Sequence, residues 1–116
     1  MKKIYYLSTC DTCKRILKEF NLSSEFIKQD IKINPITESE LEEFFQFTKS
    51  YEGLINKRAR MYKERGLKNK NLNESDFKKL LLEHYTFLKR PVLINDTEVF
   101  IGNSKTVVCS AKESLK

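Results

Sequence analysis

The stretch Ile4-Tyr5-Tyr6-Leu7-Ser8-Thr9-Cys10-Asp11-Thr12-Cys13 places a C-x-x-C pair between an apolar run and an amphipathic segment. The run from Lys3 to Leu7 predicts a short buried strand. The apolar residues behind it recur at the helical spacing i, i+3, i+4 and i+7: Cys13, Ile16, Leu17 and Phe20. A C-x-x-C at such a junction predicts thiol chemistry, because the unpaired N–H groups and positive end of a helix N-terminus stabilise a thiolate.

The two cysteines of this motif differ in position. Cys10 stands where the helix begins, so we expect solvent to reach its thiol and assign it as the candidate attacking thiolate. Cys13 lies one turn further on, and this spacing permits a disulfide with roughly 5–6 Å between the Cα atoms. Cys13 is therefore either the resolving thiol or a small core residue. The positive charges of Lys14 and Arg15 favour a thiolate, whereas Asp11 opposes it.

The composition indicates one globular domain with a packed core. The chain has 116 residues, 40% of them apolar, with only three glycines and two prolines. The net charge of +6 fits anionic partners such as oxyanions, acidic proteins or nucleic acid, and fits equally a lysine-rich solvated surface. No apolar run approaches the ~20 residues that span a bilayer, and the N-terminal run is too short for a signal peptide. We therefore predict a cytoplasmic protein without a membrane partner.

Three cysteines in a reducing compartment argue against a structural disulfide framework. They leave redox or nucleophilic chemistry, metal binding or plain burial. A zinc site would need two ligands besides the C-x-x-C pair. Only Cys109 and His84 remain, and neither has finger-like spacing, so no metal site is predicted. We expect His84 to pack or to form a structural hydrogen bond on an apolar helix face.

The rest of the chain predicts an α/β fold with the order β-α-β, a helical middle, then β-β-α. The second strand is expected at Glu25 to Lys28, running on to Asp30-Ile31. The middle shows a capping-box helix from Thr37, a short helix from Tyr51 that continues through a basic stretch to Gly66, and a helix from Asn73 with His84 on its face. Two short strands, 92–94 and 99–101, are expected around a four-residue loop. A last helix opens at 102–104 with Val107, Val108 and Ala111 inside and Cys109 outside.

Three segments of the chain resemble the ArsC/Spx family, which holds glutaredoxin-coupled arsenate reductases, Spx transcriptional regulators and reductase-like relatives. The segments are 6–14, 54–58 and 83–94, the last containing Lys89-Arg90-Pro91 before a strand. The order and spacing of these segments match the family over nearly the whole chain. The resemblance implies a thioredoxin-like mixed sheet with a helical insertion, in a single ArsC-like domain over 1–116. Its core would be about 1–34 and 87–116, and its insertion about 35–86.

The resemblance also implies roles for individual residues. Cys10 takes the nucleophile position, and Arg58 and Arg90 take the positions of two arginines that embrace the oxyanion or mixed disulfide. The Arg90–Pro91 bond is expected to be cis and Pro91 to abut the thiol site. A guanidinium suits this role, because its paired donors stay charged at any working pH. The residues alone leave another interpretation of Arg58, an exposed basic helix residue with Arg60 beside it.

Two functions follow, from different classes. The first is a thiol-dependent oxidoreductase related to arsenate reductases, with no bound cofactor, a small anionic or thiol substrate, glutathione as co-substrate and glutaredoxin as a partner. The second is an Spx-like regulator that binds the RNA polymerase α subunit through a Cys10–Cys13 switch, with no direct contact to nucleic acid. The chain departs from the family pattern at one position relevant to each function. Residues 101–104 lack the third arginine that arsenate reductases carry there, and Ser50 stands where Spx regulators carry glycine.

Overall fold

A computed structural model describes residues 1–116, which form two compact units. The first unit comprises Met1–Asn34 and Arg90–Lys116, and the second comprises Pro35–Lys89. The order of the elements is β-α-β, a helical middle and β-β-α, as expected. That all of them form a single domain stays a prediction. None of the helices is both long and apolar enough to cross a membrane.

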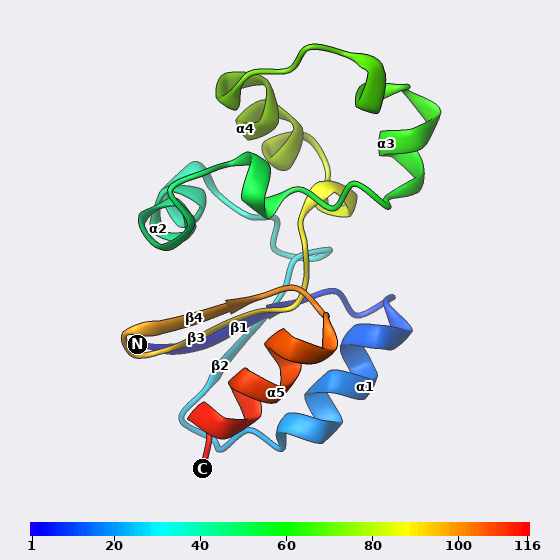
Figure 1. Ribbon diagram of the computed structural model, residues 1–116. Helices are drawn as coiled ribbons and strands as arrows, with labels where there is room; N and C mark the ends of the chain where they lie inside the picture. The colour runs from blue at the N-terminus through cyan, green and yellow to red at the C-terminus, as the bar shows by residue number, and fades with distance from the viewer. The chain divides into compact units, whose positions relative to one another are not determined.

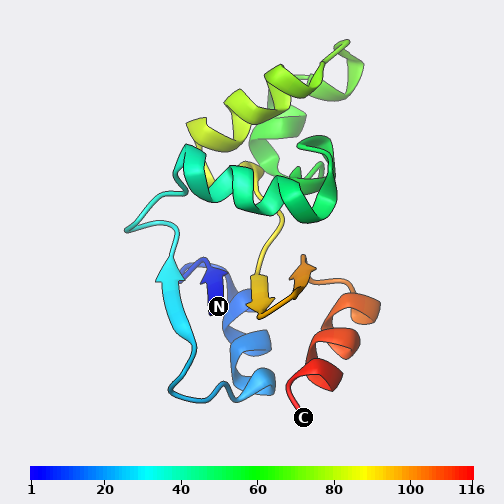
Figure 2. The ribbon, with the colours of Figure 1, turned by 90° about the vertical axis from the view of Figure 1, so that its left-hand side faces the viewer.

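The first unit is built on a four-stranded mixed sheet with the strand order β2-β1-β3-β4 (Figure 2). Its strands are β1 (Lys2–Tyr6), β2 (Ile27–Asp30), β3 (Val92–Asn95) and β4 (Glu98–Ile101). β1 pairs with β2 in parallel, and β1–β3 and β3–β4 are antiparallel. A parallel pair needs a crossover connection, which the helix α1 (Asp11–Phe20) supplies. The predicted mixed α/β fold is confirmed.

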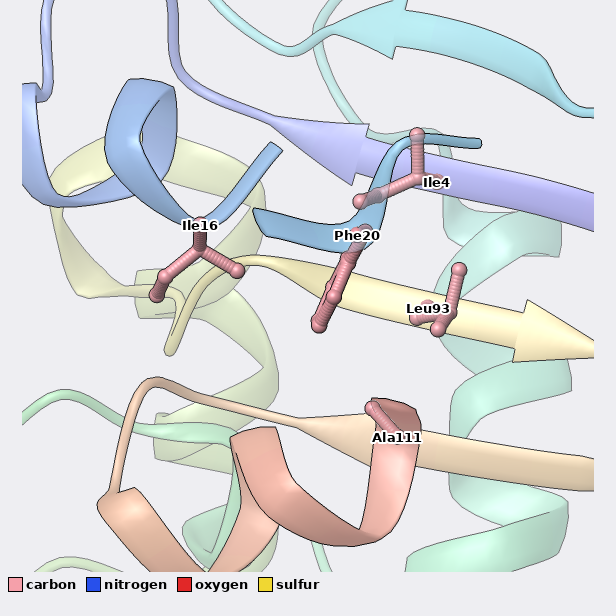
Figure 3. Packing of buried hydrophobic residues seen from close by; sticks show 5 residues of the cluster. All are labelled: Ile4, Ile16, Phe20, Leu93 and Ala111. Carbon is pink, nitrogen blue, oxygen red and sulfur yellow. The ribbon is translucent and has the colours of Figure 1, made fainter. Parts of the chain in front are cut away.

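Two helices, α1 and α5 (Lys105–Ser114), lie side by side against one face of this sheet (Figure 1). Their buried side chains meet those of the two central strands in one apolar cluster (Figure 3). The cluster contains Ile4, Ile16, Phe20, Leu93 and Ala111. Cys13 is buried on the same helix face as Ile16, which confirms the face predicted from the helical spacing. This packing fixes α1, and with it the loop that carries Cys10.

The second unit consists of helices and short 3₁₀ turns. In order these are α2 (Glu38–Thr48), η1 (Glu52–Leu54), α3 (Arg60–Glu64), η2 (Leu67–Asn69), α4 (Glu74–Glu83) and η3 (Tyr85–Phe87). Capping boxes start α2 at Thr37 and α4 at Asn73. In each box the side chain of the N-cap residue accepts a hydrogen bond from the backbone N–H of the third helical residue, and the carboxylate of that third residue accepts one from the backbone N–H of the N-cap. Gly66 follows α3 with φ +62°, in the left-handed conformation typical of a residue after a helix.

Four local predictions need correction. The second strand begins at Ile27 rather than Glu25, because only Ile27 to Asp30 find partners on β1. The expected helix from Tyr51 is one 3₁₀ turn, after which Ile55 bridges to Leu88. His84 is not on the face of α4, because it lies beyond the last residue of that helix. The hairpin loop has two residues rather than four, since Asn95 pairs with Glu98.

Candidate thiol site

The backbone places Cys10 at the N-terminus of α1. Its φ of −97° and ψ of 112° are extended, and its carbonyl accepts the first helical hydrogen bond, from the Lys14 N–H at 3.1 Å. The Cys10 N–H donates to the Leu7 carbonyl at 3.0 Å and closes a tight turn over Ser8 and Thr9. The Cys10 side chain is half-buried. Its sulfur lies at the positive end of the helix, beside the first backbone N–H groups of α1.

The neighbours of Cys10 favour its thiolate. Burial raises the pKa of this thiol, but hydrogen bonds from the Cys13 backbone N–H and the Cys13 thiol lower it. The charge of Arg90 and a hydrogen bond from its guanidinium lower the pKa further. The sum is a pKa below the ordinary value of 9.0. Nucleophilic attack requires the thiolate, so the surroundings favour Cys10 over Cys13 as the thiol that could attack.

Cys13 has the opposite character. Its side chain is fully buried, and burial raises the pKa of the Cys13 thiol to about 12, with the charge of Cys10 adding to the rise. The backbone N–H of Leu7 donates a hydrogen bond to the Cys13 sulfur, and the Cys13 thiol donates to Cys10. At neutral pH Cys13 is thus a protonated hydrogen-bond donor held against the end of β1.

Arg90 is half-buried two residues before β3, and it is the arginine that the first unit brings to Cys10. The Arg90–Pro91 peptide bond is cis, which confirms the expectation from the family resemblance. Pro91 is buried, and its carbonyl accepts the Gly102 N–H at 2.9 Å, which ties the start of β3 to the end of β4. A ligand contact by Pro91 stays a prediction.

Arg58 belongs to the second unit and is exposed. The Arg58 N–H donates to the Asn56 side-chain oxygen at 3.1 Å, so the loop before α3 has a defined backbone. The segment before it is anchored by hydrogen bonds from Asn56 N–H to Phe87 and from Lys89 N–H to Leu54, at 2.7 and 2.8 Å. Whether Arg58 joins Arg90 in binding an anion at Cys10 stays a prediction.

Asp30 is a residue that the sequence did not single out for the site. It has the one buried charged side chain of the chain, 8% exposed, and it ends β2 beside β1. Its Oδ1 accepts the N–H of Ser8 at 3.2 Å and the N–H of Lys32 at 3.1 Å. The signal in the sequence was an acidic residue at the end of the strand that follows the C-x-x-C helix.

The remaining candidates have other environments. His84 Nδ1 accepts the Thr86 N–H at 3.0 Å, which confirms a structural hydrogen bond for this histidine. Cys109 is exposed on α5, outside the inner face, as expected. No group of three or more histidine, cysteine, aspartate or glutamate side chains is placed to hold a metal ion.

Comparison with known proteins identifies the family. The model of the ArsC family matches residues 5–111. The chain belongs to the ArsC family. The match takes in the Cys10 turn, the helical unit and the first part of α5, so Cys10, Cys13 and Arg90 lie in the part that the ArsC family shares.

Individual ArsC-type relatives are distant. A protein from Bacillus anthracis named global transcriptional regulator Spx 2 is 25% identical over 108 residues, which is 88% of this chain and 79% of that protein. An arsenate reductase (ArsC) related protein from Brucella melitensis has a TM-score of 0.69 at 23% identity, over 90% of this chain and 88% of that one. An arsenate reductase from Vibrio cholerae has a TM-score of 0.73 at 18% identity, and the match covers 95% of this chain and 96% of that one. At these identities, the two structures establish the shared fold alone.

Proposed function

We propose that this ArsC-family protein is a thiol-dependent oxidoreductase of the cytoplasm, with Cys10 as its nucleophile. The observation that carries the proposal is the environment of Cys10: a helix N-terminus, two hydrogen bonds from Cys13 and the Arg90 guanidinium, which together lower the pKa of its thiol. A thiolate beside a guanidinium suits a substrate that carries negative charge near the attacked atom. The glutathione of the cytoplasm would supply the reducing thiol.

With a disulfide substrate, the Cys10 thiolate attacks one sulfur and forms a mixed disulfide, and the other sulfur leaves as a thiolate. A second thiol then attacks the mixed disulfide. If glutathione attacks the substrate's sulfur, Cys10 returns as a thiolate and a glutathione mixed disulfide leaves. If Cys13 attacks the Cys10 sulfur, the substrate thiol leaves and a Cys10–Cys13 disulfide remains, which two glutathione molecules reduce. Glutathione is the more direct route, because the high pKa of Cys13 leaves little thiolate there.

With arsenate, the Cys10 thiolate forms a sulfur–arsenic(V) bond as water leaves. A glutathione thiol then attacks the Cys10 sulfur and forms a mixed disulfide. The electron pair of the sulfur–arsenic bond stays on arsenic, which leaves as arsenite, and a second glutathione restores Cys10. Arg58 and Arg90 would hold the oxyanion in this scheme, Arg90 from the start of β3 and Arg58 from the loop before α3.

The test compares Cys10→Ser with Cys109→Ser, which removes an exposed cysteine on α5. Reduction of a glutathione mixed disulfide and of arsenate is measured with glutathione and glutaredoxin present. We expect Cys10→Ser to lose at least about a hundredfold in rate, because it removes the nucleophile, and Cys109→Ser to match the wild type. Equal rates for wild type and Cys10→Ser would refute the proposal.

A second candidate function rests on the regulators among the relatives. Two proteins named global transcriptional regulator Spx 2 are each 25% identical to this chain, and its Cys10–Cys13 pair offers a disulfide switch. Such a regulator would bind the RNA polymerase α subunit in one redox state. Capture of purified α subunit by the oxidised and the reduced protein tests this. Absence of binding in both states would rule the regulator out.

A further inference from the structure

The turn that carries Cys10 depends on hydrogen bonds from outside the turn. Within Leu7–Cys10, only the Cys10 N–H is used by the turn itself, at the Leu7 carbonyl. The Leu7 N–H donates to the Cys13 sulfur, and the Ser8 N–H donates to Asp30 Oδ1 at 3.2 Å. Asp30 lies 22 residues away from Ser8 in sequence. Leu7, at the start of the turn, is therefore bonded to Cys13 of α1, and Ser8, inside the turn, is bonded to Asp30 of β2.

The Asp30 carboxylate suits this task better than an uncharged residue would. It is nearly buried, and burial of a charge is costly unless the charge is hydrogen-bonded. Its partners are the N–H groups of Ser8 and Lys32 together with the Ser8 hydroxyl, and these bonds keep the pKa of Asp30 below its ordinary value although burial opposes them. Bonds to an ionised acceptor are roughly twice as strong as neutral ones.

The Asp30 backbone adds a second connection. The next residue, Ile31, donates its N–H to the Tyr6 carbonyl at 2.9 Å, so β2 stays paired with β1 up to the start of the turn. The carbonyl of Asp30 accepts the N–H groups of Ile33 and Asn34 at 3.1 and 2.9 Å. The residue that bonds to Ser8 is thus itself fixed on both sides, which gives the Ser8 N–H a rigid acceptor.

We propose that Asp30 is a positioning residue for the Cys10 thiolate: its buried carboxylate fixes the Leu7–Cys10 turn that holds the sulfur at the N-terminus of α1. This inference rests on the proposed role of Cys10 as nucleophile. The hydrogen bonds that stabilise a thiolate depend on direction and distance, so a looser turn moves the sulfur away from the N–H groups of α1 and from Cys13.

The test uses Asp30→Ala and Asp30→Asn in a Cys109→Ser background, so that the exposed thiol on α5 does not react. The control is Glu74→Ala, which also removes a carboxylate that accepts two backbone N–H groups, those of Tyr51 and Glu52, but in the second unit. The pKa of Cys10 is read from the rate of alkylation by iodoacetamide as a function of pH. The fold of each variant is checked by circular dichroism.

We expect Asp30→Ala to raise the pKa of Cys10 by about one unit, which moves the pH profile of alkylation by the same amount. Asp30→Asn keeps an oxygen that accepts both N–H groups, though in weaker bonds, so its Cys10 pKa should lie between those of the wild type and Asp30→Ala, and Glu74→Ala should not change the Cys10 pKa. If Asp30 acted only through its charge, both Asp30 variants would lower the pKa of Cys10. That result, or no shift in Asp30→Ala, would overturn the inference.

A measurement on the unmodified chain covers the case in which Asp30→Ala does not fold. Amide hydrogen exchange should be slower at Ser8 than at the exposed Thr9 of the same turn, because only the Ser8 N–H is held by Asp30. Equal exchange at both amides would overturn the inference. An active wild type with an unshifted Cys10 pKa in Asp30→Ala refutes the role of Asp30 alone. A shifted Cys10 pKa together with full activity of Cys10→Ser refutes the reductase and leaves the role of Asp30 supported.

Discussion

At the scale of the residue, Cys10 and Cys13 show how one side-chain type takes two ionisation states within a single helical turn. Cys10 is half-buried at the helix N-terminus beside Arg90, so its thiolate is favoured. Cys13 is buried against Leu7, so its proton is retained. The protonated thiol then serves the ionised one as a hydrogen-bond donor. The asymmetry of the pair comes from burial and neighbours, not from the motif itself.

Arg90→Gln should raise the pKa of Cys10 by about one unit, because it removes the positive charge beside the thiolate. The pH dependence of iodoacetamide alkylation measures this, in the Cys109→Ser background. The matched control is Arg15→Gln, an exposed arginine on α1. Equal shifts in both variants would mean that general positive charge, rather than Arg90, stabilises the thiolate.

Cys13→Ala should also raise the pKa of Cys10, because the side-chain donor is lost while the backbone N–H remains. Cys13→Ser keeps an O–H donor at the same place, so its Cys10 pKa should lie nearer the wild-type value. Alkylation of Cys10 in both variants gives the comparison. The opposite order of the two variants would contradict a donor role for the Cys13 thiol.

At the scale of the element, the capping boxes of the second unit carry measurable stability. Thr37→Ala should lower the free energy of unfolding by about 1 kcal/mol, because the Glu40 N–H loses its side-chain acceptor, now at 3.1 Å. The control is Ser39→Ala, an exposed residue in the first turn of α2. Urea denaturation compares the two. A Thr37→Ala variant as stable as Ser39→Ala would contradict the capping role.

The helices and the cores of most strands could be predicted, because caps and apolar spacing act within a few residues. The ends of elements could not. The hairpin tightens to two residues because Asp96 adopts φ +57°, a conformation that aspartate tolerates, which lets Asn95 and Glu98 join the ladder. The helix expected from Tyr51 does not form, because residues 54–56 form backbone hydrogen bonds with residues 87–89 instead. These partners lie more than thirty residues apart in the chain.

At the scale of the whole molecule, the net charge of +6 should steer anionic reagents to the protein. We expect the rate of Cys10 with a dianionic aromatic disulfide to fall several-fold between low and high salt, because ions screen the attraction. An uncharged pyridyl disulfide serves as the control and should change little. A salt effect of the same size for both reagents would contradict electrostatic steering.

Acid should destabilise the first unit partly through Asp30. The pKa of this carboxyl is lower in the folded chain than its ordinary value of 3.8, so its contribution to stability is present above about pH 3.8 and is lost as the pH falls through the lower folded value. Asp30→Asn removes this contribution and should flatten the fall in stability over that range, followed by thermal unfolding at several pH values. Asp11→Asn, at a fully exposed carboxylate, should keep the wild-type slope.

The sequence by itself determined the alternation of strands and helices, the C-x-x-C at the start of α1, and Cys10 as the thiol at the helix N-terminus. These depend on spacing and capping among near neighbours. Only the tertiary structure decided that Cys13 is fully buried and protonated, that Arg90 reaches Cys10, and that Asp30 holds the turn before it. Burial, charge–charge attraction and a hydrogen bond across 22 residues depend on which distant segments fold together. The local spacing of residues does not specify which distant segments meet.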